Sequence, residues 1–285
     1  MNPIPDDLLE FRIGARPVRS MRLDGGILAA QVGDEPPAVV VLNGGQAFVS
    51  RATLRRLRPD LRRVAGILPP GTPFVLLGYP DKPGTQYRIT DIVEHIAHGI
   101  ATHWQCTALI GISFGGVVAA RRAAAHPVLV SRLALVSSAH RLRGLPARRA
   151  ANRLRDSLRF RQSARNDVRM LPHRLAQHAS PRSVVRSTPP RHVTSSVNER
   201  HVIVRTLRAL RDDARDGSSW PSRIRADTLI VCGAVDPIFA DAARETSARV
   251  PSATHHALAG EGHIVMFERR RQVARLIRNW LDPRS

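Results

Sequence analysis

Residues 109–116 read Leu-Ile-Gly-Ile-Ser-Phe-Gly-Gly, and this stretch decides the fold that the sequence predicts. The apolar run ending at Ile112 is typical of a buried strand, and residues 115–126 have the composition of a helix. Between them lies G-x-S-x-G, the nucleophile-elbow pattern, which holds a serine on a sharp turn. Glycines flank the serine because a Cβ atom there would collide with the crowded backbone. We therefore expect Ser113 to project from the carboxyl end of a sheet.

Short apolar runs alternate with helical periodicity on both sides of this turn. The pattern predicts strands at 38–43, 73–78, 107–112, 132–138, 228–233 and 254–258. It predicts helices around 51–64, 89–104, 115–126, 239–249 and 267–281. Such alternation builds a mostly parallel sheet flanked by helices. Ahead of it, residues 17–33 alternate around Asp24-Gly25-Gly26, which predicts an antiparallel β-hairpin.

The segment 139–226 interrupts this alternation. It is rich in arginine and carries helical stretches separated by prolines, so we interpret it as a helical cap. The α/β core would then consist of residues 1–138 and 227–285. The cap holds 21 arginines and 6 acidic residues, whereas the whole chain has a net charge of +21. Most of the positive charge is therefore expected over whatever the cap covers.

Two residues downstream of Ser113 have the chemistry that a serine nucleophile needs. A serine hydroxyl is a weak nucleophile at neutral pH, so it needs a base, and an acid must hold that base in one tautomer. Asp236 follows the predicted strand at 228–233, and His263 ends the glycine-rich run Gly-Glu-Gly-His. We predict Ser113 as nucleophile, His263 as base and Asp236 as the acid that orients the base.

Each of these three residues also has a purely structural interpretation. Ser113 stands where it would cap a helix, and Asp236 precedes Pro237 as helix-capping aspartates often do. His263 is one of twelve histidines and would be an ordinary loop residue. The catalytic interpretation is favoured because all three occur together and in an order known for serine hydrolases.

The chain resembles the α/β-hydrolase superfamily from about residue 37 to the C-terminus, outside the cap. The resemblance rests on four motifs, which are LNGGQAF at 42–48, GISFGG at 111–116, GAVDP at 233–237 and GEGH at 260–263. It implies an α/β-hydrolase fold with a helical cap insertion and the catalytic roles named above.

The resemblance also implies an oxyanion hole formed by backbone N–H groups. One donor is the N–H of Phe114, at a helix N-terminus where partial positive charge favours an oxyanion. The pair Asn43-Gly44 stands where the superfamily commonly has His-Gly. The second donor is then the N–H of Gly45, with Gln46 as the alternative.

The predicted reaction is hydrolysis of a carboxylic ester or thioester through an acyl-enzyme, as in an esterase or thioesterase. The basic cap suggests an anionic or carrier-bound substrate, with coenzyme A or an acyl carrier protein as candidate partners. An acyltransferase that uses the same three residues is one alternative. A polyanion-binding protein on a hydrolase scaffold is another, although aromatic residues make up only 4% of the chain and argue against nucleic acid.

Composition excludes several other classes of protein. Hydrophobic residues make up 43% of the chain, no stretch is long and apolar enough to span a bilayer, and the N-terminus lacks a secretory pattern. We therefore expect a cytoplasmic protein. Cys106 and Cys232 both fall in apolar runs and are expected as buried core residues rather than a disulfide. Dinucleotide, phosphate-loop and zinc motifs are absent from the sequence, so neither a cofactor nor a metal is expected.

Overall fold

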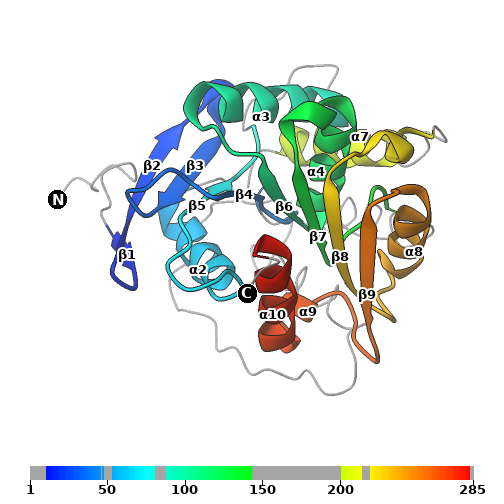
Figure 1. Ribbon diagram of the computed structural model, residues 1–285. Coiled ribbons are helices and arrows are strands. Elements are labelled where there is room, and N and C mark those ends of the chain that lie inside the picture. The colour runs from blue at the N-terminus through cyan, green and yellow to red at the C-terminus, as the bar shows by residue number, and fades with distance from the viewer. Residues whose placement is uncertain are drawn as a thin grey trace, which may run out of the picture.

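The computed structural model describes residues 11–45, 47, 53–80, 88–142, 200–213 and 219–282. These residues build a nine-stranded sheet with the order β1-β2-β3-β5-β4-β6-β7-β8-β9 and helices on both sides (Figure 1). The strands are β1 (Phe11–Ile13), β2 (Arg16–Arg22), β3 (Leu28–Val32), β4 (Val39–Leu42), β5 (Phe74–Leu77), β6 (Ala108–Ile112), β7 (Arg132–Val136), β8 (Asp227–Gly233) and β9 (Ala253–Leu258). The expected mostly parallel α/β architecture is confirmed.

Strands β4 to β9 are parallel, and β1 to β3 form an antiparallel extension at one edge. The predicted hairpin is present as β2 and β3, which are joined by a short 3-10 turn, η2 (Asp24–Gly26). Gly25 and Gly26 have φ values of 73° and 78° there, which a residue with a Cβ atom adopts only under strain. The sequence pattern did not predict β1, which is only three residues long.

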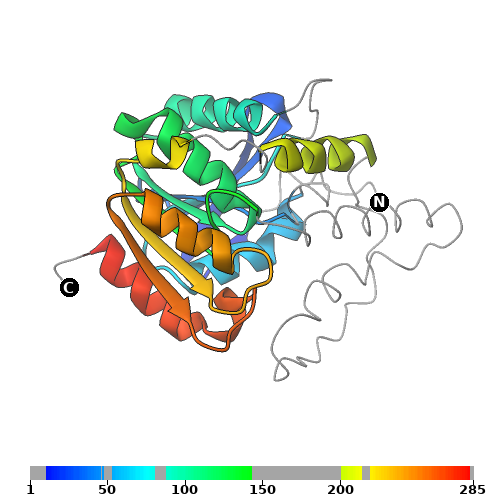
Figure 2. The same ribbon diagram turned by 90° about the vertical axis from the view of Figure 1, so that its right-hand side faces the viewer.

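Helices cover both faces of the sheet because most have one apolar stripe to bury, whereas α4 (Phe114–Ala125) is buried on nearly all sides. One face carries α3 (Ile89–His103), α4, α7 (Arg200–Asp213) and α8 (Ala240–Arg249). The other face carries α2 (Leu54–Ala65), α9 (Val265–Glu268) and α10 (Arg270–Leu281). Figure 2 shows α3, α4 and α7 above the sheet and α10 below it.

Two of the helices on the second face illustrate why these sequences are helical. In α2 the buried side chains are Leu54, Leu57, Leu61 and Val64, which recur every three or four residues, and Thr53 caps the N-terminus. In α10 the buried side chains are Val273, Ile277 and Trp280. Both stripes join one apolar cluster with the underside of the sheet. The predicted single helix at 267–281 is interrupted at Arg269, where the backbone leaves the helical region.

The two cysteines differ in their surroundings. Cys232 lies in β8 and is buried, as expected. The prediction for Cys106 is confirmed only in part, because Cys106 packs against the core on both faces of the sheet, but β6 begins only at Ala108 and leaves it in the preceding loop, partly exposed. Neither forms a disulfide.

Only the two ends of the predicted cap at 139–226 fall within the described residues. Residues 143–199 and 214–218 lie outside them, so the cap and its domain boundaries stay a prediction. At the C-terminal end, α7 contacts α3, and the 3-10 turn η5 (Trp220–Arg223) contacts α4 and α8. No helix in the described part of the chain has the length and apolar character needed to cross a membrane.

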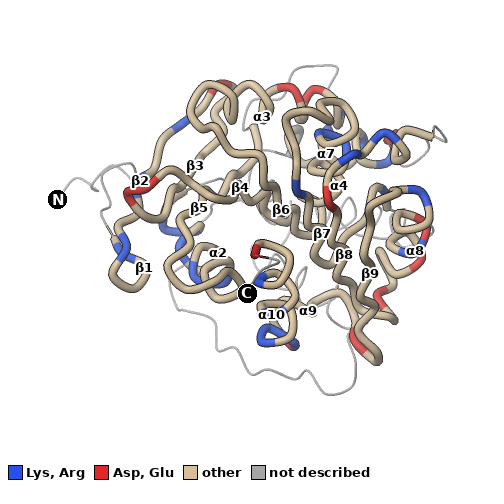
Figure 3. The backbone as a smooth tube through the Cα atoms, in the orientation of Figure 1, with Lys and Arg blue, Asp and Glu red and all other residues tan. Residues whose placement is uncertain are grey.

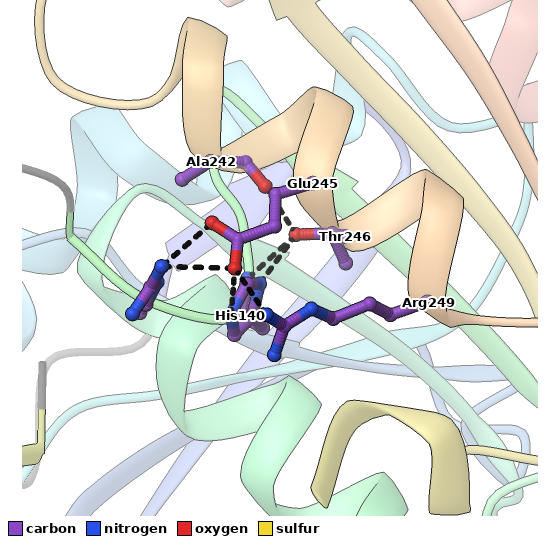
Figure 4. A network of polar contacts seen from close by, with 6 residues as sticks. His140, Ala242, Glu245, Thr246 and Arg249 are labelled. Carbon is purple, nitrogen blue, oxygen red and sulfur yellow. Dashed lines mark hydrogen bonds and ion pairs between the residues drawn. The ribbon is translucent and has the colours of Figure 1, made fainter. Parts of the chain in front are cut away.

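At the N-terminal end of that segment, His140 connects β7 to α8 through a network of polar contacts (Figure 4). Its Nδ1 lies 2.8 Å from Oγ1 of Thr246, which in turn donates to the carbonyl of Ala242 at 2.6 Å. The Thr246 hydroxyl therefore accepts from the His140 ring, which carries its proton on Nδ1. The neighbouring Glu245 carboxylate is held by Arg141 at 2.7 Å and by Arg249 at 2.9 Å.

Candidate active site

Ser113 lies on the turn between β6 and α4 with a backbone that strongly disfavours a side chain. Its φ is 51° and its ψ is −118°. The predicted need for flanking glycines is met, because a Cβ atom at Gly111 would lie 2.3 Å from the Cα of Gly116. A Cβ atom at Gly115 would lie 2.3 Å from the carbonyl oxygen of Leu42. The tight packing of strand, turn and helix thus stabilises the strained conformation.

The backbone of Ser113 is held on both sides by the end of β7. Its N–H donates to the carbonyl of Val136 at 3.0 Å, and its carbonyl accepts from the hydroxyl of Ser138 at 2.6 Å. A Cβ atom at Gly116 would lie 2.1 Å from that hydroxyl, so a glycine is required for Ser138 to reach the turn. The sequence did not predict the role of Ser138, because no local pattern indicates a contact between residues 25 positions apart.

The structure brings the three predicted residues together in one hydrogen-bonded chain. Oγ of Ser113 lies 3.0 Å from Nε2 of His263, and Nδ1 of His263 lies 2.9 Å from Oδ2 of Asp236. An ionised carboxylate can only accept, so Nδ1 carries the proton in this contact. Nε2 is then left with its lone pair toward the Ser113 hydroxyl, as a general base requires.

Asp236 combines the two interpretations that its sequence position allowed. One carboxylate oxygen, Oδ1, accepts from the backbone N–H groups of Ile238 at 2.8 Å and Phe239 at 3.2 Å, as in a capped turn. The other oxygen, Oδ2, faces His263. The side chain has no solvent exposure. The turn thus fixes the carboxylate so that only one oxygen is presented to the imidazole.

The thiol of Cys232 approaches the same Oδ2 at 3.5 Å from within β8. Burial, reinforced by the negative charge of Asp236, raises the pKa of this thiol well above its usual range. Cys232 is therefore a neutral donor toward the carboxylate rather than a nucleophile.

Close backbone packing and an aromatic ring hold the loop that carries His263. A Cβ atom at Gly233 would lie 2.1 Å from the carbonyl oxygen of Gly262, so only glycine lets β8 pass this loop. The ring of Phe239 stacks on the imidazole, with centroids 5.6 Å apart and planes inclined by 24°. Sequence reasoning missed Phe239, which has no motif of its own.

The loop after β4 lies beside Ser113 and is ordered by Asn43. The Asn43 side chain accepts from the N–H of Gly44 at 2.8 Å and donates to Asp60 at 3.1 Å. The backbone carbonyl of Asn43 accepts from the hydroxyl of Tyr79. At the position where the resemblance leads one to expect histidine, Asn43 thus holds the loop by accepting a hydrogen bond from the next backbone N–H.

Phe114 follows Ser113 directly, and the turn that contains Gly45 begins beside the serine. Phe114 is the first residue of α4, whose dipole favours negative charge at that end. A Cβ atom at Gly44 would lie 3.7 Å from the Cβ of Ser113, which places the start of the Gly44-Gly45 turn against the serine. The N–H of Gly44 is already bound to Asn43, which leaves Gly45 as the next donor along the loop. Gln46, the alternative donor, lies outside the described residues, and the oxyanion hole stays a prediction.

Within the part of the chain that the structure describes, no three His, Cys, Asp or Glu side chains gather in a way that would hold a metal ion.

Known proteins share both the sequence family and the fold of this chain. The model of the alpha/beta hydrolase family matches residues 39–276. No curated protein matches the sequence significantly. Several solved structures share the fold at low sequence identity. They include a hydrolase from Pseudomonas aeruginosa PA01 (18% identity, 93% of this chain and 98% of that chain, TM-score 0.68). They also include an alpha/beta hydrolase fold protein from Chitinophaga pinensis (13%, 95% and 99%, TM-score 0.69) and an esterase from Exiguobacterium antarcticum (21%, 92% and 98%, TM-score 0.64).

Proposed function

The chain belongs to the alpha/beta hydrolase family, and from this premise we propose that it is a serine hydrolase that cleaves a carboxylic ester or thioester. The observation that carries the proposal is the hydrogen-bonded chain from Ser113 through His263 to Asp236. A buried acid, an imidazole in one tautomer and a serine on a strained turn are the parts that acyl transfer needs.

In the first half of the reaction, Oγ of Ser113 bonds to the acyl carbon while Nε2 of His263 takes the hydroxyl proton. The bond to the alcohol or thiol then breaks, and His263 returns the proton to that leaving group. Asp236 stays ionised and stabilises the imidazolium that forms between these steps. The product of this half-reaction is an acyl-enzyme on Ser113.

In the second half, water attacks the acyl carbon and His263 again accepts the proton. The bond to Oγ breaks, the proton passes to Ser113, and the carboxylic acid leaves. In both halves the negative oxygen of the tetrahedral intermediate accepts from the N–H groups of Phe114 and Gly45. Loss of one such donor raises the barrier by about 3 kcal/mol in other serine hydrolases.

We propose further that the natural substrate is anionic or bound to an acidic carrier, such as a coenzyme A thioester or an acyl carrier protein. This rests on the charge of the segment 139–226, with 21 arginines and 6 acidic residues. Long-range attraction by such a segment raises the association rate of anions and weakens with ionic strength.

Labelling of the serine tests the core of the proposal. A fluorophosphonate probe should modify Ser113 in the folded protein, as located by peptide mapping, and Ser113→Ala should abolish the labelling. The same variant should lower kcat on p-nitrophenyl esters by about 10⁴-fold or more. Ser247→Ala, at a partly exposed serine on α8, is the matched control and should retain both. Unchanged turnover in Ser113→Ala would remove serine from the mechanism.

Ionic strength tests the substrate class. We expect kcat/KM for an anionic acyl donor to fall steeply between about 10 mM and about 500 mM salt, whereas the value for a neutral donor of equal chain length should change little. An equal response of the two donors would contradict steering by the basic segment.

A further inference from the structure

Helices α2 and α10 are distant in sequence but pack side by side with α9 on the same face of the sheet (Figure 1). The guanidinium of Arg63 lies 5.0 Å from the ring centroid of Phe267 in α9. A Cβ atom at Gly66, which ends α2, would lie 3.4 Å from the side chain of Arg270. The outer surfaces of α2 and α10 therefore form one continuous surface.

We call this surface the arginine face and define it by its exposed arginines. They are Arg55, Arg58, Arg62, Arg63, Arg269, Arg270, Arg271, Arg275 and Arg278. In α10, positions 271, 275 and 278 repeat at helical spacing opposite the buried stripe. Figure 3 shows the basic positions along both helices.

The charge of this surface is not explained by a general excess of arginine. Of the 44 basic and 23 acidic residues, the segment 139–226 holds 21 and 6, and the stretches 53–66 and 267–282 together hold ten and three. This leaves 13 basic and 14 acidic residues for the rest of the chain. Outside these regions the protein is close to neutral, so the positive charge of the arginine face is local.

The few acidic side chains near the arginine face neutralise little of it. Asp60 is 2.6 Å from Arg63 and also accepts from Asn43. Glu261 is buried and binds Arg269 at 2.6 Å. Among the described residues, no acidic group is recorded against the outward arginines 62, 271 and 275.

The opposite face of the sheet has a different charge pattern. Between residues 89 and 103, α3 has two acidic residues and no arginine. In α8 the charges form pairs, with Arg244 at 3.2 Å from Asp241 and Arg249 at 2.9 Å from Glu245. Helices α3 and α8 thus present a mixed surface, whereas basic residues predominate on α2 and α10.

A large apolar side chain is exposed on the arginine face. The side chain of Phe267 is 51% exposed, although a ring of this size is ordinarily buried. It lies on α9, which begins two residues after His263. An aromatic ring among arginines, whose stems are apolar and whose heads are cationic, matches the layered polarity of a lipid headgroup region.

We propose that the arginine face docks the protein onto an anionic lipid bilayer, with Phe267 entering the headgroup layer. A flat array of negative headgroups complements the exposed arginines of α2 and α10, and it can take up the ring as well. Docking in this way would bring the loop of His263 close to the bilayer surface, because Phe267 is only four positions after His263 in the chain. The proposal stands without the proposed hydrolase activity, since it depends only on charge and exposure.

Vesicle sedimentation tests the docking. We expect the full-length protein to sediment with vesicles of phosphatidylcholine and phosphatidylglycerol at about 50 mM salt, and binding should be lost at about 500 mM salt or on phosphatidylcholine alone. The triple variant Arg62→Gln, Arg271→Gln, Arg275→Gln should bind the anionic vesicles about 100-fold more weakly, since each basic residue near such a surface contributes about fivefold.

A matched triple variant controls for total charge. Arg208→Gln, Arg223→Gln, Arg225→Gln removes three exposed arginines outside the arginine face, in α7 and around η5. It should bind within about threefold of the native protein if only the arginine face contacts lipid. Equal weakening by the two triple variants would overturn the proposal, because affinity would then follow net charge alone. Circular dichroism and thermal unfolding establish that both variants fold.

A single substitution and two other polyanions test the nature of the partner. Phe267→Ser keeps every charge and should still weaken vesicle binding by about fivefold or more if the ring enters the headgroup layer. A different outcome is that the native protein binds duplex DNA or polyglutamate but not anionic vesicles, and that the first triple variant loses this binding. This result would overturn the proposed bilayer partner in favour of nucleic acid or an acidic protein.

Discussion

Oδ2 of Asp236 lies 2.9 Å from Nδ1 of His263, while Oδ1 of the same carboxylate closes the turn that leads into α8. One side chain thus links the ring that contacts Ser113 to the local backbone. Function and stability are therefore coupled at Asp236. A substitution that keeps the oxygen bound to the turn and one that removes both oxygens should separate the effect on activity from the effect on stability.

Asp236→Asn should lose activity with little loss of stability. The amide oxygen can still accept from Ile238 and Phe239, but its NH₂ group would face Nδ1 and favour the wrong imidazole tautomer. We expect kcat to fall by about 10⁴-fold. Asp236→Ala should lose activity as well and should also lower the free energy of unfolding by about 1–2 kcal/mol, since the turn loses its cap. Equal stability of the two variants, measured by urea unfolding, would contradict the double role.

Gly233→Ala should disturb the site without touching any of the three reacting side chains. The added methyl would lie 2.1 Å from the carbonyl oxygen of Gly262 and 2.2 Å from that of Glu261, so the loop of His263 must move. A displacement of this kind can lower kcat by about 100-fold. Gly71→Ala is the control, because it has a φ of 84° but nothing within 4 Å of the new atom. It should cost about 1 kcal/mol of stability and leave kcat unchanged.

Ser138→Ala should weaken the support beneath the nucleophile. The carbonyl of Ser113 would lose a buried donor at 2.6 Å, at a cost of about 1–3 kcal/mol. If this bond also fixes the direction of Oγ, the rate of fluorophosphonate labelling should fall, and Ser138→Thr, which keeps a hydroxyl, should recover part of it. A labelling rate identical to that of the native protein would limit Ser138 to a structural role.

His140 should make the protein less stable as the pH is lowered. Burial is the largest cause that lowers the pKa of His140 to about 4. The charge of Glu245 opposes this shift, and the charges of Arg141, Arg249 and Arg121 add to it. The unfolded chain, with a histidine pKa of about 6.5, binds a proton that the folded protein excludes between these values. Stability contributed by neutral His140 is therefore present above about pH 6.5 and is lost as the pH falls toward about 4.

The contribution of His140 is measurable as the slope of the urea midpoint against pH. A pKa shift of this size lowers the free energy of unfolding by about 3 kcal/mol over the whole pH range. The urea midpoint of the native protein should fall over that pH range more steeply than the midpoint of His140→Gln. His98→Gln, at a histidine whose side chain is 68% exposed, is the control and should keep the native slope. Identical slopes in all three proteins would contradict the assignment to His140.

The strands, the helices and the meeting of Ser113, Asp236 and His263 could be predicted because each has a local requirement visible in the sequence. Gly111 and Gly115 mark a turn too crowded for Cβ atoms, and Asp236 and His263 each follow the end of a predicted strand. The predicted bounds of the elements are within a few residues of those observed. The main misplacement was Cys106, whose apolar surroundings gave no sign that the strand begins two residues later.

What the sequence did not predict depends on contacts between distant segments. Ser138 and Phe239 have no motif, and their roles follow only from how β7 and the turn after Asp236 pack around the site. The arginine face has the same origin. About 200 residues separate α2 from α10, and only the order of strands in the sheet brings their arginines onto one surface.

The backbone of Ser113, with φ at 51° and ψ at −118°, means that this fold is more stable with another residue at that position. Glycine adopts such angles freely, whereas serine raises the energy of the folded state by about 1–3 kcal/mol. A library selected purely for thermal resistance should therefore drift toward glycine at residue 113 and lose turnover. Keeping serine at this turn is the expected signature of selection for chemistry over robustness.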